Sequence, residues 1–252
     1  MKLALATGTP IQTSIVSPYE NTSVCDQPFA LCQPLLGSDA DDIKAAAKQL
    51  GKNYSWRSTV AVPEGGGGGR FRPGPTEGKT DDGTVMLTMT RGDNTVQAVL
   101  KGEKTVVKLE GEWRTLEDLT QDGQQGPGRF IAFVLRGYKA PAVDAADIAG
   151  KTKELKKDGD AYSGDLTEEA AKTLLMFRGG RGGQGAPTPT KASGSAKFWV
   201  KDGKLAKYEY KVSGTMNFNG EDRDIERTTT VEIKDIGSTK LDIPEDAKKK
   251  LS

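Results

Sequence analysis

Paired carboxylates are the side chains in this sequence whose type and spacing could support a reaction. Neighbouring acids occur at 41–42, 81–82 and 168–169, and two carboxyl groups that converge in a cleft can act as general acid and base. Each pair, however, stands at an expected helix start or turn, where capping and solvation account for it. The chain has 0 histidines, which excludes Ser-His-Asp and Cys-His catalysis and histidine-containing zinc sites. We therefore expect no catalytic residues, and a protein that is not an enzyme.

The two cysteines, Cys25 and Cys32, are too few for a tetrathiolate metal site. A disulfide between them would close a short loop and needs an oxidising compartment, so both the paired and the free state stay open. No residue set indicates a cofactor or a metal, and we expect neither. The segment Met1–Ala6 hints at an export signal but is interrupted at Thr7–Pro10, so either the protein is not exported or the true start lies elsewhere.

Two glycine-containing motifs resemble nucleotide- or RNA-binding sequences. Gly74–Thr80 resembles the end of a P-loop, but Asp81-Asp82-Gly83 follows where that motif needs a helix. Arg178–Gly183 resembles an RGG box without the usual repeats and interleaved aromatics. Lysine plus arginine (36) nearly balances aspartate plus glutamate (35), so no dominant attraction to nucleic acid or to an anionic membrane arises. We expect no nucleic-acid partner, and no stretch is apolar and long enough to span a membrane as a helix.

An aromatic stripe in the last sixty residues has more functional potential. Every second position from Ala206 to Phe218 is apolar or glycine, and the positions between are polar; this period of two predicts a strand with one buried face. Asp202-Gly203 and Asn219-Gly220 bound the strand with hairpin-turn residues. With Phe198 and Trp56, the tyrosines of this strand either form a packed core or line a pocket together with Phe130 and Phe133.

The elements that position this stripe follow from caps, periodicity and turn residues. Residues 1–37 are predicted to be a disordered leader, and 38–252 a single domain with Gly-rich loops at 63–83 and 178–194. Helices are expected after the caps Ser38 and Thr167, over Gly128–Tyr138 and Ala142–Ala149, as one turn at Leu116–Leu119, and from Glu245. The expected strands are Asn53–Val62, Thr84–Thr90, Thr95–Leu100, Thr105–Leu109, a hairpin of 151–157 with 160–165, Ser195–Lys201, Ala206–Phe218, Arg223–Ile236 and Thr239–Ile243. This order predicts an α+β fold, a strongly curved antiparallel sheet (half-barrel) with helices covering the concave face.

This layout, the Glu112-Trp113 turn and the strand–Asp-Gly–long strand–Asn-Gly–strand–Pro ending resemble the outer-membrane lipoprotein carrier and related periplasmic lipoprotein-like half-barrels, from about Ser38 to Ser252. The resemblance implies an exported, periplasmic or secreted protein that holds acyl chains in an apolar cavity. By position, the implied cavity wall is Trp56, Phe130, Phe133, Val134, Tyr208, Tyr210, Val212, Met216 and Phe218.

We therefore expect a non-enzymatic, monomeric, exported protein that binds a lipid or another hydrophobic ligand. The alternative is a structural or interaction module whose core is fully packed and whose Gly/Arg loops bind a partner. The volume of the cavity separates the two, because a space below a few hundred Å³ favours the alternative. A third possibility, a hydrolase that uses carboxylates alone, requires two carboxyl groups to converge in a cleft.

Overall fold

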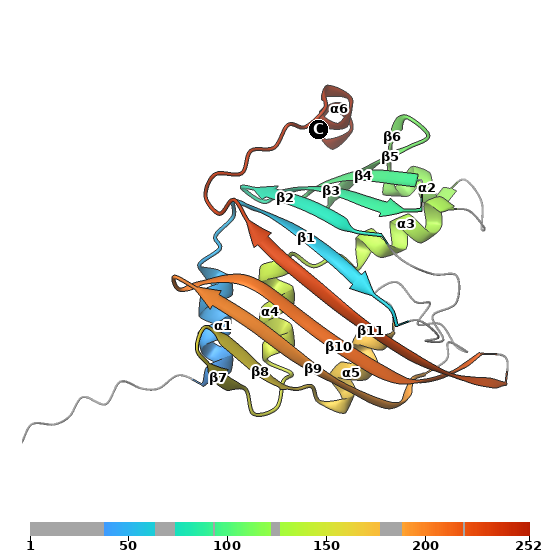
Figure 1. Ribbon diagram of the computed structural model, residues 1–252. Coiled ribbons are helices and arrows are strands. Elements are labelled where there is room, and N and C mark those ends of the chain that lie inside the picture. Colours follow the sequence, from blue (N-terminus) through green and yellow to red (C-terminus); the bar gives the residue numbers. More distant parts are fainter. Residues whose placement is uncertain (1–37, 64–73, 93, 122–126, 177–187, 219) are drawn as a thin grey trace, which may run out of the picture. The chain divides into compact units, whose positions relative to one another are not determined.

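The computed structural model describes residues 38–63, 74–92, 94–121, 127–176, 188–218 and 220–252 (Figure 1). The predicted leader 1–37, with Cys25 and Cys32, lies outside the described residues, as do the glycine-richest parts of both predicted loops. Residues Gly37–Ser252 form one compact unit, and the structural statements below concern that unit.

One antiparallel sheet of 11 strands runs through this unit, in the order β6-β5-β4-β3-β2-β1-β11-β10-β9-β8-β7. Most strands pair with their neighbours in sequence. The exception in the middle of the sheet is β1, which pairs with the distant strand β11. The edge strands β6 and β7 do not pair with each other, so the sheet formed by the described residues is open. The strands are β1 Tyr54–Ala61, β2 Thr76–Asp81, β3 Thr84–Arg91, β4 Asn94–Lys101, β5 Lys104–Leu109, β6 Glu112–Thr115, β7 Lys156–Asp158, β8 Ala161–Asp165, β9 Thr190–Lys201, β10 Lys204–Phe218 and β11 Glu221–Lys234.

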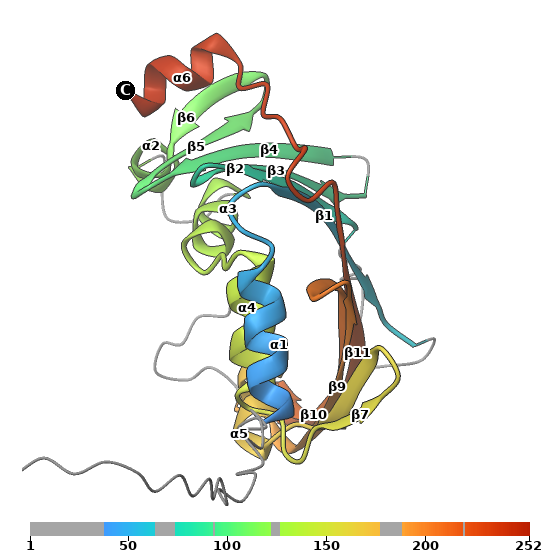
Figure 2. The same ribbon diagram turned by 90° about the vertical axis from the view of Figure 1, so that its left-hand side faces the viewer.

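Six helices of the described residues complete the fold: α1 Asp39–Lys48, α2 Leu116–Gln121, α3 Pro127–Arg136, α4 Pro141–Ala149, α5 Glu168–Leu175 and α6 Glu245–Leu251. The expected caps are present: Ser38 Oγ accepts from the Asp41 N–H at 3.3 Å and Thr167 Oγ1 from the Ala170 N–H at 3.2 Å. Figure 2 shows α1, α4, α5 and α3 on the concave side of the curved sheet and α6 on the other side. The predicted α+β half-barrel with helices on its concave face is therefore confirmed.

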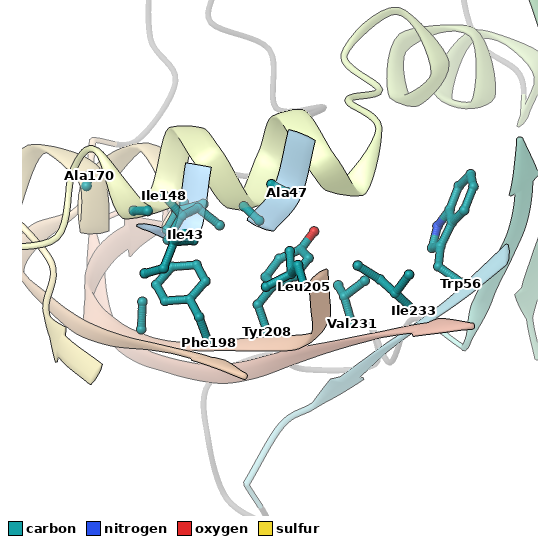
Figure 3. Packing of buried hydrophobic residues seen from close by; sticks show 14 of the residues in the cluster. Ile43, Ala47, Trp56, Ile148, Ala170, Phe198, Leu205, Tyr208, Val231 and Ile233 are labelled. Atoms are coloured by element: carbon teal, nitrogen blue, oxygen red, sulfur yellow. The ribbon is translucent and has the colours of Figure 1, made fainter. Parts of the chain in front are cut away.

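The main core lies between the β8–β11 half of the sheet and helices α1, α4 and α5. Cross-strand pairing aligns Tyr162, Phe198, Tyr208 and Val231 in one buried row. Phe198 lies beneath the helix residues Ile43 and Ile148 (Figure 3), and all of these residues belong to one buried cluster. A smaller cluster on the convex face packs α6 against β4–β6; its buried members are Val99, Val106, Trp113, Ala247 and Leu251.

Four of the predicted segments are wrong. Only the end of the strand expected at 151–157 lies in a strand, because β7 spans Lys156–Asp158. Thr239–Ile243 is not a strand, and its first residue pairs with Asn53 instead. Asn53 Oδ1 accepts from the Thr239 N–H at 2.7 Å, and Asn53 Nδ2 donates to the Thr239 carbonyl at 2.6 Å. The predicted loop 63–83 contains β2, and the predicted loop 178–194 contains the start of β9 at Thr190. Both strand segments are polar and carry glycine, so neither shows an apolar alternation.

Arg227 of β11 anchors the C-terminal end of α5. Its guanidinium donates to the Leu174 carbonyl, one of the helix-end carbonyls that lack an intrahelical partner. Burial lowers the pKa of Arg227 below its ordinary value. This contact holds α5 onto the concave face.

Replacing Arg227 by methionine is expected to reduce the free energy of unfolding by about 1.5–3 kcal/mol, because a hydrogen bond from a charged donor is lost and the carbonyl stays unpaired. Urea denaturation measures the change. Arg223→Met is the matched control: Arg223 is exposed on the same strand, pairs with Glu221 at 2.9 Å, and should cost less than about 1 kcal/mol. Equal costs for the two variants would contradict the anchoring role.

Candidate functional site

The concave face has two halves that differ in how completely they are filled. In the half under α1, α4 and α5, Tyr208 and Val212 are buried in the core. The Tyr208 hydroxyl donates to the buried Asp144 carboxylate of α4 at 3.0 Å, and the Tyr208 ring stacks on Phe198 at 6.4 Å. Figure 3 shows these side chains directed toward the covering helices. Two of the residues expected to line a cavity are thus packing residues of this core.

The remaining predicted residues of β10 become less buried along the strand. Tyr210 is partly buried against the core, Met216 is partly buried, and Phe218 is 37% exposed near the end of the β10–β11 ribbon. The Arg223 guanidinium lies 5.9 Å from the centre of the Phe218 ring. A register shift between Leu205 and Lys207 also brings Leu205, rather than Ala206, into the core. The strand therefore does not present one continuous apolar wall.

Trp56 is the central packing residue of the other half of the concave face, which β1–β6 form. It lies on β1, opposite Gly78 of β2. A Cβ atom on Gly78 would lie 2.0 Å from the Trp56 ring, so the indole covers the glycine directly. The ring stacks on Tyr138 (6.3 Å, 21°) and meets Tyr54 at 5.7 Å. Trp56 consequently joins two strands to the connection between α3 and α4.

Two rows of apolar side chains extend from Trp56 across the concave face. The first row follows the register Gly78, Leu87, Ala98 and Val107, and it is buried. The next positions on the same face of β3, β4 and β5 are Met89, Val96 and Leu109, which are only partly buried. The cover over this half thus protects the first row and leaves the second partly accessible.

Helix α3 lies on the concave side of this half (Figure 2) and has apolar residues on two faces. Gly128, Ala132 and Leu135 are buried on one face. Helical spacing places Phe130, Phe133 and Val134 on another face; Phe130 is 39% exposed and the other two are partly buried. The Arg91 guanidinium lies 5.1 Å from the centre of the Phe130 ring, which places this end of α3 beside the end of β3.

We call these partly exposed apolar residues of α3 and the neighbouring strands the α3 surface: Met89, Val96, Leu109, Phe130, Phe133 and Val134. Four of the nine predicted lining residues belong to it or adjoin it, namely Trp56, Phe130, Phe133 and Val134. The other five belong to β10. The structure thus separates the predicted wall into two groups, and the ligand-binding role of the nine stays a prediction.

The described residues also outline cavities that are lined by both charged and apolar side chains. One, of about 520 Å³, lies between α1, β8 and the β9–β10 turn, and its lining includes Asp42, Lys157 and Lys204. Another, of about 410 Å³, lies along the β10–β11 ribbon, with Lys191, Asp224 and Glu226 in its lining. None of the nine predicted residues lines either cavity.

The carboxylate pairs have local partners. Asp41 pairs with Lys44 at 3.0 Å, and this hydrogen bond is the main cause of its lowered pKa. Glu168 pairs with Lys172 at 2.7 Å, and Asp81 accepts from Asn53 Nδ2 at 2.8 Å. Within the described ranges, no three His, Cys, Asp or Glu residues gather closely enough to hold a metal ion. Likewise, no described helix has the length and apolar character to cross a membrane.

Sequence reasoning missed β2, Met89, Val96, Leu109 and Tyr138 as parts of this region. The strand β3 did carry a signal, because Val85, Leu87 and Met89 alternate along it. The sequence of β2 shows no such alternation. The feature that places this strand is the contact between Gly78 and the Trp56 ring, which appears only in the structure.

An open, curved antiparallel sheet with helices on its concave face places this protein in the half-barrel class of α+β folds. Among solved structures, the chain is similar to LprF from Mycobacterium bovis, with 10% sequence identity, a TM-score of 0.41, and coverage of 82% of this chain and 96% of that one. No protein-family model matches the chain, and no curated protein matches it.

Proposed function

We propose that this protein is a non-enzymatic binder of a hydrophobic ligand with an acyl chain, which is held against the α3 surface. One observation carries the proposal: apolar side chains on α3 and on β3–β5 stay partly exposed, while the other half of the concave face is filled. The site therefore differs from the wall implied by the sequence, because Tyr208 and Val212 belong to the filled half.

The physical reason is the apolar area that a ligand would remove from water. Full burial of one large apolar side chain contributes roughly 1.5–3 kcal/mol, and the six residues of the α3 surface are each partly exposed. A linear acyl chain can follow a helix and the strand row beside it. The exposed Arg91, beside Phe130, places a positive charge at one end of this surface, where an anionic or polar head group would lie.

The proposal includes export and a monomeric state, with no nucleic-acid partner; the sequence resemblance and the near-zero net charge support these parts. The second candidate function is an interaction module with a packed core. The filled half under α1, α4 and α5 favours it, whereas most of the Gly/Arg segments that would bind its partner lie outside the described residues.

Replacing Val134 by aspartate is expected to weaken binding of a fluorescent fatty acid at least ten-fold, because a charge would have to be buried against the acyl chain. Fluorescence titration of detergent-free protein measures the affinity. Val143→Asp is the matched control: Val143 is 52% exposed on α4, outside the α3 surface, and its replacement should leave the affinity unchanged.

Thermal unfolding of both variants checks that each stays folded. Native mass spectrometry of the wild-type protein supplies a second readout. A clean apo mass together with no uptake of the fluorescent fatty acid would exclude a hydrophobic-ligand function and favour the interaction module.

A further inference from the structure

Tyr138 holds a buried hydroxyl group that forms no hydrogen bond. The residue lies just after α3, and its ring stacks on Trp56. Of the buried side-chain polar atoms in the described residues, its hydroxyl oxygen is the one without a partner. Two other tyrosine hydroxyls of the concave face do have partners: Tyr208 donates to Asp144 at 3.0 Å and Tyr162 to Asp42 at 3.2 Å.

An unpaired buried hydroxyl destabilises the conformation that buries it, because the same group would bond to water if it were exposed. Burial, with the nearby Tyr54 and Asp144, raises the pKa of Tyr138. The arrangement that places Tyr138 against Trp56 is therefore less stable than its apolar contacts alone would make it.

The element that can relieve this cost is α3. The connection 137–140 joins α3 to α4, and α4 is held firmly: Ala145, Ile148 and Ala149 are buried, and Asp144 bonds Tyr208. Helix α3 buries only Gly128, Ala132 and Leu135 among its described side chains, and its Phe130 face stays partly exposed. A movement about this connection would expose the Tyr138 hydroxyl. It would also separate Ala132 and Leu135 from the core cluster, while α1, α4 and α5 stay in place.

We propose that α3 is a lid over the concave face of β1–β5, and that the unpaired Tyr138 hydroxyl keeps this lid easy to open. When α3 moves away, the hydroxyl binds water and the partly buried row Met89, Val96 and Leu109 becomes more accessible. When α3 returns, it covers a bound chain. The ligand part of this inference rests on the proposed function, whereas the opening itself is a property of the ligand-free protein.

Tyr138→Phe tests the inference, because it removes the hydroxyl and keeps the ring that stacks on Trp56. Hydrogen exchange followed by mass spectrometry on the ligand-free protein should show the amides of 128–138 exchanging roughly ten-fold more slowly than in the wild type. The uptake rate of the fluorescent fatty acid should fall in parallel. Exchange of 128–138 that is unchanged or faster in this variant would overturn the lid.

Tyr208→Phe is the control, because it removes a hydroxyl that has a partner. This variant should speed exchange in α4 and β10 and should not slow it in 128–138. The two proposals can fail separately. Slowed exchange without any fatty-acid uptake would support the lid and contradict the proposed ligand. Uptake with unchanged exchange would support the ligand and contradict the lid.

Discussion

Replacing Phe198 by alanine is expected to lower the free energy of unfolding by about 3–5 kcal/mol. Phe198 has 0% of its surface exposed and lies in the middle of β9, paired with Tyr162 on one side and Tyr208 on the other. Helix residues of α1 and α4 close the space above it (Figure 3), so the deleted ring would leave a cavity that the rigid sheet cannot collapse into. Denaturant unfolding monitored by circular dichroism measures the loss.

Phe218→Ala is the matched control for this prediction. It makes the same chemical change near the end of the β10–β11 ribbon, where the ring is 37% exposed, and should cost less than about 1 kcal/mol. A similar, small cost for both variants would mean that the half under α1, α4 and α5 is loosely packed. In that case the cavity expected around Tyr208 and Val212 would again be the better candidate site.

Replacing Gly78 by alanine is expected to cost about 3 kcal/mol, the upper end for overpacking a core. The new Cβ would lie 2.0, 2.3 and 2.5 Å from three atoms of the Trp56 ring, distances at which the indole must move. Trp56 cannot move without losing its stacking on Tyr138. The strain would therefore reach from β2 to the connection between α3 and α4.

A double-mutant cycle with Trp56→Leu isolates this clash. In the Trp56→Leu background, Gly78→Ala should cost less than about 1 kcal/mol, because the smaller side chain leaves room for a methyl group. Free energies of unfolding from urea titrations give the coupling. An equal cost of Gly78→Ala in both backgrounds would show that the glycine is needed for the backbone of β2 rather than for the indole.

Local signals in the sequence predicted much of the fold. The alternation along Ala206–Phe218 and the Asp202-Gly203 turn predicted the β9–β10–β11 meander, and Ser38 and Thr167 predicted two helix starts that the structure confirms. The errors arise where a distant partner decides. Thr239, the first residue of the segment 239–243, pairs with Asn53, which is 186 residues away along the chain. β2 is polar and contains Gly78, so its sequence does not favour a strand. The Trp56 ring over Gly78 explains the glycine, and that contact is not visible in the sequence.

The sequence predicted only part of the candidate site, because contacts between distant segments decide the rest. The sequence correctly shows that Phe130, Phe133 and Val134 share a face of a helix, but α3 is apolar on two faces, so periodicity does not decide which one is buried. The tyrosine stripe of β10 predicts an inward-facing strand equally well for a packed core and for a cavity. Which of the two forms depends on where α1 and α4 lie, and packing between distant segments determines that.

The most direct test of the central claim is photo-crosslinking with a palmitate analogue that carries a diazirine near its methyl end. After irradiation and proteolysis, mass spectrometry locates the adducts, and competition with unlabelled palmitate identifies the specific ones. We predict competable adducts on α3 (Pro127–Arg136) and on β3–β4 (Thr84–Lys101). Competable adducts on α1, α4 or β9–β10, or no competable adducts, would contradict a hydrophobic site at the α3 surface.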